Sequence, residues 1–503
     1  MALDRRSFLK LAGSAASALL FPKLVSQVKM LSGGDTRPNI IVILFDAMSA
    51  RNLSVYGYPR RTTPNFERFA ERAIVYHNHY SGGNYTIPGT ATLLTGSYPW
   101  THRALNYAGQ INHKLMANNI FHVLGEDYHR IAFGQNVWAH LLLSQFANEI
   151  DTLLSPGSYG EINYLLNDYF PNDRNMASRA LDGFLFNRDL SPASVVFGPL
   201  YRAMYYRETT MVDATGYPRG IPQHVTYPIY FRLAELFDGL AALINGFSSP
   251  TFAYLHLFPP HAPYRSDDQF FGKFVDNWSP VNKPDHRLGD HLDKQVVKTA
   301  RRTYDEYLAT IDWEFGKFMQ VLEDNGVFEN SYVIVTSDHG EMFERGEKAH
   351  ASVLLYDPVI HIPLLISVPG QKTRQDVYIP THAVDVLPTL AQLAGKPIPV
   401  WSEGRPLPGL GGMEQTGRSI YTVEAKNNPA FTPLNRTTIV LQKNGYKLIY
   451  YKGYESQDTF ELYDLTTDIE ELDDLYPMQP SASKLLVQEL LDTLSDADKP
   501  YKR

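Results

Sequence analysis

The sequence predicts an α/β protein with a central, mostly parallel sheet flanked by helices. Continuous apolar and β-branched runs at 39–45, 251–258 and 332–336 are typical of strands buried on both faces of a parallel sheet. Segments with helical apolar spacing lie between such runs, at 66–72 and 301–321. Strands that alternate with helices favour parallel pairing, because each crossover returns the chain to the same end of the sheet.

Weaker patterns continue this alternation along the chain. Short strands are expected at 74–76, 131–133 and 361–368, and helices from 90–94 and at 383–393. These elements extend the predicted α/β domain over residues 37–400. The stretch from about 141 to 245 is less regular and is expected to be an insertion over the core.

The C-terminal residues, 401–503, show short strands joined by tight turns. Strands are expected at 437–442, 446–451 and 461–465, and a closing helix at 482–494. The Asn444-Gly445 pair between the first two strands is a frequent hairpin turn, because both residue types tolerate positive φ. Residues 401–503 are therefore expected to form a small antiparallel sheet plus a helix, as a C-terminal subdomain.

Composition limits the possible functions. Of 503 residues, 44% are hydrophobic and 20% are charged, which suits a folded protein with a large core. The net charge is −8 and there is no basic run, so the sequence offers no electrostatic footprint for nucleic acid. There is no cysteine, which excludes disulfides, thiolate metal sites and a cysteine nucleophile.

The N-terminus has the features of an export signal. A basic segment, Arg5–Lys10, is followed by a short apolar run, Leu11–Phe21. This order is that of a signal peptide, and the paired arginines resemble a twin-arginine signal, which carries folded proteins. Residues 1–31 are therefore predicted to be recognised by the twin-arginine export machinery, and the protein to be exported, to the periplasm or the extracellular space.

Residues that could carry chemistry stand at the predicted strand ends. Asp46 follows the 39–45 strand, and Asp338 and His339 follow the 332–336 strand. Thr86 precedes a predicted helix. The carboxyl ends of parallel strands meet at one edge of a sheet, where active groups collect. Two carboxylates, an imidazole and a hydroxyl suit a divalent cation, and Zn, Mn, Mg and Ca all remain possible.

Thr86 needs help to act as a nucleophile, since a threonine hydroxyl is weakly reactive at neutral pH. A neighbouring cation and a helix N-terminus would both lower its pKa. Each residue also has a structural interpretation when taken alone. Asp46 could cap a turn, Asp338-His339 could form one, and Thr86 could be a surface hydroxyl. The joint pattern favours the functional interpretation.

The ordered segments that carry these residues resemble the sulfatase family of the alkaline-phosphatase superfamily. The resemblance covers residues 37–476. It rests on Pro38–Asp46, Tyr56–Tyr58, Thr63–Phe66, Thr86–Pro99, Pro260–Tyr264, Ser337–Glu341, Ile362–Leu365, Tyr446–Ile449 and Glu461–Leu465. It implies an alkaline-phosphatase-like sheet in residues 37–400 and a divalent metal ion, with one favoured and a second left open.

The resemblance also implies roles for individual residues. Asp46, Thr86, Asp338 and His339 would be the metal ligands, and Thr86 would be the nucleophile. This set is similar to the single-metal site of phosphoethanolamine and lipoteichoic-acid transferases.

Three further residues would be catalytic by the same resemblance. His261, His350 and Lys348 would bind the anionic oxygens of the substrate or protonate the leaving group. The structural alternatives are a loop histidine held by prolines for His261 and a solvated charge for Lys348.

Three positions depart from the sulfatase pattern. Sulfatases oxidise a Cys or Ser to formylglycine, which requires two hydrogens on the β-carbon, and Thr86 carries a methyl group there. Thr90 stands where sulfatases have a supporting Arg, and Ala47 where many have a second metal-binding Asp. These changes argue against a formylglycine mechanism.

The predicted function is therefore a metal-dependent hydrolase or phosphotransferase that acts on a phosphate monoester or diester through Thr86. Its substrate would be a small molecule or a glycan or lipid ester. Two alternatives stay open. One is a sulfatase that works without formylglycine, and the other is an exported binding protein that has kept the fold and lost catalysis.

Overall fold

A computed structural model describes residues 37–160, 214–224, 229–247, 250–478 and 481–502. It has an eight-stranded sheet in the order β5-β4-β6-β1-β7-β8-β2-β9. The predicted signal peptide, 1–31, lies outside the described residues, and so does most of the predicted insertion. Within the part of the chain that is described, no helix is both long and apolar enough to cross a membrane.

The central strands of this sheet are parallel. β1 (Asn39–Asp46) lies between β6 (Thr251–Pro260) and β7 (Ser331–Ser337) and is parallel to both. The other strands are β4 (His129–Gly134), β5 (Thr152–Leu154), β8 (Leu364–Ser367), β2 (Ile74–Tyr76) and β9 (Gln375–Val377). Only β8 is antiparallel to its neighbours, β7 and β2. The prediction of a mostly parallel sheet is confirmed.

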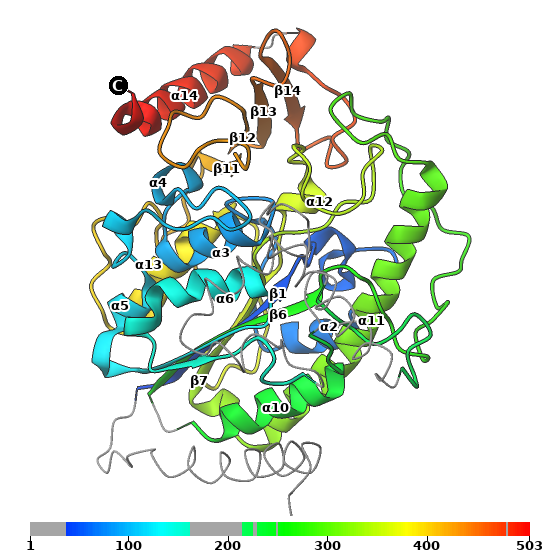
Figure 1. Ribbon diagram of the computed structural model, residues 1–503, viewed down its shortest axis with the longest axis vertical. Coiled ribbons are helices and arrows are strands. Elements are labelled where there is room, and N and C mark those ends of the chain that lie inside the picture. The colour runs from blue at the N-terminus through cyan, green and yellow to red at the C-terminus, as the bar shows by residue number, and fades with distance from the viewer. Residues whose placement is uncertain (1–36, 161–213, 225–228, 248–249, 479–480, 503) are drawn as a thin grey trace, which may run out of the picture.

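Helices cover both faces of the sheet (Figure 1). On one face lie α3 (Thr86–Thr95), α5 (Ile120–Leu124), α6 (Val137–Leu143) and α13 (Val386–Leu393). On the other lie α2 (Pro64–Ala70), α10 (Leu233–Asn245) and α11 (Lys294–Asp324). β1 alternates between the two cores, because successive side chains of a strand point to opposite faces. Ile41, Ile43 and Phe45 pack on the α11 side and Ile40, Val42 and Leu44 on the α3 side.

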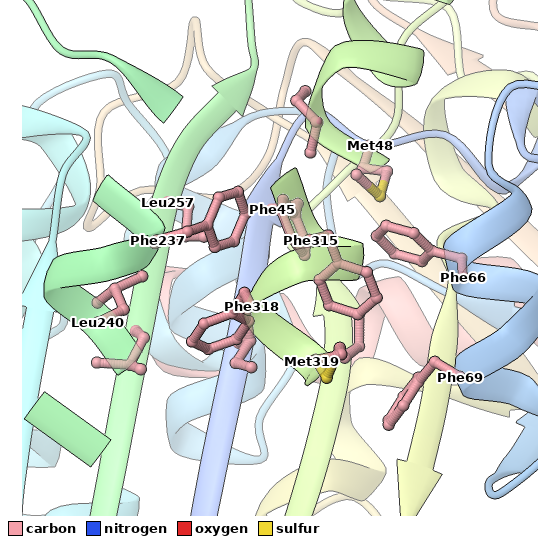
Figure 2. Packing of buried hydrophobic residues seen from close by; sticks show 14 of the residues in the cluster. Phe45, Met48, Phe66, Phe69, Phe237, Leu240, Leu257, Phe315, Phe318 and Met319 are labelled. Carbon is pink, nitrogen blue, oxygen red and sulfur yellow. The ribbon is translucent and has the colours of Figure 1, made fainter. Parts of the chain in front are cut away.

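Aromatic side chains pack tightly beneath the end of β1. The Phe66 ring of α2 stacks on the Phe315 ring of α11 with 4.2 Å between centroids, and Phe45 lies 5.6 Å from Phe66. Figure 2 shows these rings with Met48 and Phe69 around them. Each buried Phe contributes about 2–3 kcal/mol of hydrophobic stabilisation. This packing gives a rigid base to the residue that follows Phe45, which is Asp46.

The C-terminal region forms the predicted small antiparallel sheet with a helix. Its strands, in spatial order, are β11 (Ile420–Glu424), β12 (Thr437–Lys443), β13 (Tyr446–Lys452) and β14 (Thr459–Asp464), and α14 (Ser481–Asp498) packs on them. Asn444 and Gly445 both have positive φ, as the hairpin turn requires.

Small elements complete the architecture. They are α4 (Pro99–His102), α12 (Asp357–Ile360), and the two-stranded pair β3 (His79–Tyr80) and β10 (Thr381–His382). β8 begins at Leu364, three residues later than the strand expected at 361–368, because α12 and Pro363 occupy the approach. The ends of the region expected to be an insertion belong to the core, since β5 is an edge strand of the main sheet and α10 packs on α11.

Candidate active site

Two acidic residues and a histidine lie on one sheet face at the carboxyl edge. Asp46 ends β1, Asp338 follows β7, and His256 lies near the end of β6. Asp46 has the same parity as Leu44, and His256 the same parity as Tyr254, so both point to the face that α3 covers. All three side chains are fully buried. Strands distant in sequence thus bring ionisable groups together.

The predicted ligands form a compact set. One ligand atom each of Asp46, Asp338 and His339 lies within 4.8 Å of the others. His339 Nε2 is 3.3 Å from Asp46 Oδ1 and 3.7 Å from Asp338 Oδ2. Among the described residues, none of these three atoms has a hydrogen-bond partner. Unpaired buried polar atoms are costly, and a divalent cation would satisfy all three at once. The residues present therefore fit a metal ion.

The same closeness shifts the ionisation of these groups. Burial would raise the pKa of Asp46, but His261, His256 and His339 keep that pKa well below its ordinary value. Burial and the Asp46 charge raise the pKa of Asp338 to about 6. Burial opposes protonation of His339, but Asp338 and Asp46 raise its pKa to about 9. Without a cation, His339 therefore supplies the positive charge of the cluster.

Thr86 is brought to this cluster by α3, of which it is the first residue. Its side chain is nearly buried, and Asn136 Nδ2 lies 3.2 Å from Thr86 Oγ1 and 2.5 Å from Asp46 Oδ2. Gly89, on the same helix, lies against the backbone of Asp338. A Cβ at Gly89 would come within 2.2 Å of the Asp338 carbonyl oxygen, so only glycine allows this approach.

The two predicted catalytic histidines lie beside the ligand set. The His350 ring is 4.3 Å from the His339 ring and 5.0 Å from the His261 ring, between centroids. Glu341 Oε1 lies 3.0 Å from His350 Nδ1, which leaves His350 Nε2 as the nitrogen without that contact. Burial lowers the pKa of both His261 and His350, so both favour the neutral form. Asn84 Nδ2 donates to the His350 carbonyl oxygen at 2.8 Å.

Lys348 is not placed among these groups by any contact of the described residues. Its side chain is exposed, two residues before His350.

Ala47, at the position of the missing second Asp, has a positive φ of 62°. Its backbone N–H lies 3.3 Å from Asp338 Oδ1, which is the carboxylate oxygen other than the unpartnered Oδ2. Its methyl group offers no ligand.

Three buried residues at the site were not predicted from the sequence. Asn136 contacts both Asp46 and Thr86, Glu341 contacts His350, and His256 Nε2 is 3.5 Å from Asp46 Oδ2 and 3.7 Å from Asp338 Oδ2. A weak signal exists for His256, which is the one residue of its otherwise largely apolar strand whose side chain ordinarily titrates near neutral pH. Asn136 carried no signal, since an Asn before a helix is an ordinary cap.

A mostly parallel sheet that brings two carboxylates, an imidazole and a helix-borne hydroxyl to its carboxyl edge is an arrangement suited to ester hydrolysis assisted by a divalent cation. The chain belongs to the sulfatase family, because residues 38–396, well over half of the chain, match the family model described as Sulfatase. Residues 347–499 match the model for the C-terminal part of N-sulphoglucosamine sulphohydrolase. The family makes the protein an ester hydrolase.

Individual relatives agree with this assignment. An N-acetylglucosamine-6-O-sulfatase of Bacteroides thetaiotaomicron is 24% identical over 93% of this chain and 87% of the relative. The phosphonate monoester hydrolase of Agrobacterium radiobacter has the same fold, with a TM-score of 0.66, 19% identity and coverage of 92% of this chain and 96% of that one. Another protein, whose structure was solved in complex with its substrate D-glucosamine-2-N,6-O-disulfate, also has a TM-score of 0.66 with this chain. The two chains are 17% identical, and the match covers 93% of this chain and 100% of that one.

These similarities bear on the predicted function. The sulfatase family and the alkaline-phosphatase-like fold are confirmed. The preference for a phosphate ester is not supported to the same degree, since the family and the curated relative are sulfatases. The alternative of a sulfatase fits the similarities better than the phosphate prediction does.

Proposed function

We propose that this protein hydrolyses the sulfate ester of a small molecule or glycan, with an unmodified Thr86 as its nucleophile. The observation that carries the proposal is the place of Thr86, at the start of α3 beside the buried Asp46, Asp338 and His339. Membership of the sulfatase family supports the sulfate ester, and the name of the Bacteroides relative supports a sugar as the alcohol part.

The reaction has two displacements. Thr86 Oγ1 gives its proton to the neutral His261 or His350, which flank the site, and forms a bond to sulfur, while the bond from sulfur to the alcohol oxygen breaks. The histidine that took up this proton then gives it to the leaving alcohol and returns to its neutral form. Water then attacks the same sulfur, and Thr86 and sulfate are released. A phosphorus ester would follow the same sequence, and an alcohol in place of water would make the reaction a transfer.

Asp46, Asp338, His339 and the Thr86 hydroxyl would bind one divalent cation, chosen from Zn, Mn, Mg and Ca. When bound, the cation would stabilise negative charge on the nucleophile and on the ester oxygens. The protein's own part is to fix the ligand atoms before binding. It does so with the β1 and β7 backbones, which are hydrogen-bonded in one sheet, and with the Ala47 N–H that contacts Asp338 Oδ1.

The second candidate function is hydrolysis of a phosphate or phosphonate ester. It is favoured by Thr86 itself, because the methyl group on its β-carbon prevents conversion to an aldehyde. The third, a binding protein without catalysis, is permitted by the residues that depart from the patterns of related enzymes, Ala47, Thr90 and Pro259. The twin-arginine-like segment Arg5–Lys10 supports a proposal that the protein works after export, in the periplasm or outside the cell.

A side-by-side ester panel tests the proposal. The purified protein is loaded with Zn, Mn, Mg or Ca and assayed on nitrophenyl sulfate, nitrophenyl phosphate and a nitrophenyl phosphonate. We expect sulfate turnover to be the fastest, and to fall at least 1000-fold in Thr86→Ala and with chelator, since nucleophile and cation each contribute several kcal/mol. Peptide mass should show an unmodified threonine at position 86.

Each other outcome has a distinct meaning. Faster turnover of a phosphorus ester would replace the sulfate proposal with the second candidate. Full activity in Thr86→Ala would refute the nucleophile. No turnover of any ester, together with no bound metal, would favour the binding protein. A chain that is expressed with residues 1–31 and is found only in the cytoplasm would refute export.

A further inference from the structure

Asn136 lies between β4 and α6, at the edge of the candidate active site. It is the N-cap of α6, and its Oδ1 accepts a hydrogen bond from the Trp138 backbone N–H at 2.9 Å. An amide nitrogen cannot accept such a bond, so this contact identifies which end of the side chain is oxygen. The Asn136 side chain is 1% exposed, and its orientation is therefore determined by the helix that it caps.

The cap directs the amide nitrogen into the site. Asn136 Nδ2 lies 2.5 Å from Asp46 Oδ2 and 3.2 Å from Thr86 Oγ1. An ionised carboxylate can only accept, so one amide hydrogen goes to Asp46, and the second is available to Thr86 Oγ1. With its oxygen on α6 and its nitrogen on β1 and α3, this one side chain joins three elements. Their residues 46, 86 and 136 are far apart in sequence.

We propose that Asn136 is the positioning residue of the nucleophile, which sets Thr86 Oγ1 against the Asp46 carboxylate. This inference rests on the proposed function, since it assumes that Thr86 is the nucleophile. A donor aimed at Thr86 Oγ1 favours the orientation in which that oxygen accepts, so the hydroxyl hydrogen points away from Asn136 and towards another acceptor. A donor at this place also stabilises negative charge as it develops on the oxygen.

Other roles for Asn136 are separable from this one. A purely structural cap would need only Oδ1, and any good capping residue would replace it. Aspartate caps a helix about as well as asparagine, but it would present a second carboxylate oxygen to Asp46 Oδ2 and Thr86 Oγ1, where a donor stood. The Asn136→Asp substitution therefore keeps the helix cap and removes the hydrogen-bond donor that faces Thr86 Oγ1, almost without a change in the shape of the side chain.

The test compares Asn136→Asp and Asn136→Ser with Asn112→Asp. Asn112 is a matched control, because its side chain also caps a helical turn, by accepting from the Lys114 N–H at 3.1 Å, without a contact to Asp46 or Thr86. The assay uses the ester of the panel that the unaltered protein turns over fastest. Thermal midpoint, bound metal, kcat and KM are measured for every variant.

We expect kcat to fall about 100-fold in Asn136→Asp, the size of effect seen when one well-placed donor is removed from an active site. In Asn136→Ser, the serine can cap the helix but is too short to reach Thr86 Oγ1, and kcat should fall at least 10-fold. KM should change less than threefold in both, because Asn136 faces the nucleophile. Thermal midpoints should stay within 2–3 °C of the unaltered protein, and Asn112→Asp should match it in every measurement.

Unchanged kcat in either Asn136 variant would overturn the inference. So would a rise in KM alone, which would make Asn136 a substrate contact. If Asn136→Asp fails to fold or loses its metal, Asn136→Ser decides. Thr86→Ala separates the two hypotheses. An inactive Thr86→Ala with fully active Asn136 variants refutes only the inference, whereas an active Thr86→Ala, or no turnover by the unaltered protein, refutes the proposed function and the inference with it.

Discussion

Two buried groups of charged side chains in this protein differ in how their members are bonded. In the candidate active site, Asp46, Asp338 and His339 lie close together without a hydrogen bond between their side chains, whereas hydrogen bonds join the charged groups where the C-terminal sheet meets α12. At the contact, Lys447 Nζ of β13 lies 2.5 Å from Glu471 and 3.5 Å from Asp357 of α12, and all three are buried. We call these three residues the junction cluster. Glu471 also accepts a hydrogen bond from the Asp357 N–H. At the active site, His339 Nε2 lies 3.3 Å from Asp46 Oδ1 and 3.7 Å from Asp338 Oδ2, and none of these three atoms has a hydrogen-bond partner among the described residues.

The difference separates two uses of buried charge. Paired charges at the junction cluster add directional contacts between the C-terminal sheet and α12. Unpaired groups at the site destabilise the fold unless a ligand arrives, and they persist because the surrounding sheet determines their positions. Substitutions in the two places should therefore affect different quantities, activity in one and stability in the other.

The largest effect is expected at the site. Asp338→Asn should lower turnover more than about 1000-fold, because it removes a charged ligand atom worth several kcal/mol in the transition state. In chelator, the variant should be at least as stable as the unaltered protein at pH 8. Burial and Asp46 raise the pKa of Asp338, so its ionised form destabilises the fold above about pH 6. Denaturant unfolding in chelator measures this, and a clear loss of stability would contradict it.

Lys447→Met should lower the stability of the fold and leave turnover unchanged. It leaves the carboxylates of Glu471 and Asp357 buried without their cation, and removal of one partner of a buried ion pair destabilises by about 3–5 kcal/mol. Turnover per folded molecule should not change. The control is Lys372→Met, because Lys372 pairs with Glu329 at the surface and both are more than half exposed. Urea unfolding should show that this control lowers the free energy of unfolding by less than about 1 kcal/mol.

Acid should weaken the fold through histidines that must stay neutral. His102 Nδ1 accepts from the Ala104 N–H, and burial lowers the pKa of His102 to about 3. The unfolded chain takes up a proton near pH 6.5 and the folded one does not, so the stability from neutral His102 is complete above that pH and is lost as the pH falls. Between pH 7 and pH 5 this amounts to about 2 kcal/mol.

The check is the free energy of unfolding at several pH values for the unaltered protein and for His102→Gln. Glutamine does not titrate, so the variant should lose less stability on acidification than the unaltered protein. Equal slopes would show that His102 does not contribute.

The smallest effect should come from the residue that contacts His350. Glu341→Gln keeps an acceptor for His350 Nδ1 and removes the negative charge, and we expect kcat to fall about 10-fold, or 1.4 kcal/mol. Glu347→Gln is the control. It lies on the same loop and accepts from the Asp290 N–H at 2.8 Å, away from His350. Equal losses in both variants would mean that the loop, and not His350, had been disturbed.

The sequence predicted the elements better than their neighbours in space. Long apolar runs such as 39–45 identified the central strands, and the residues directly after them, Asp46 and Asp338, meet as expected. The short strands β9 and β11 were not predicted, because a few apolar residues between turns have no distinctive period.

Asn136 and His256 could not be found in the same way. Each joins the site because β4, β6, β1 and β7 are neighbours in that order. The parity of His256 in β6 sends it to the α3 face, and Asn136 is held at the site as the N-cap of α6. Neither the strand order nor the matched parity can be derived from any one segment. The roles of His261, His350 and Lys348 came from the family resemblance, and they remain predictions.

Gly89 makes the site sensitive to volume as well as to charge. Helix α3 and the backbone of Asp338 are in contact at a point where no side-chain atom fits, so their spacing is set by the van der Waals radii of two backbones. A methyl group at position 89 would act as a wedge that separates Thr86 from Asp338 without altering any ionisable group. The proposed reaction would thus depend on a distance that no charged residue controls.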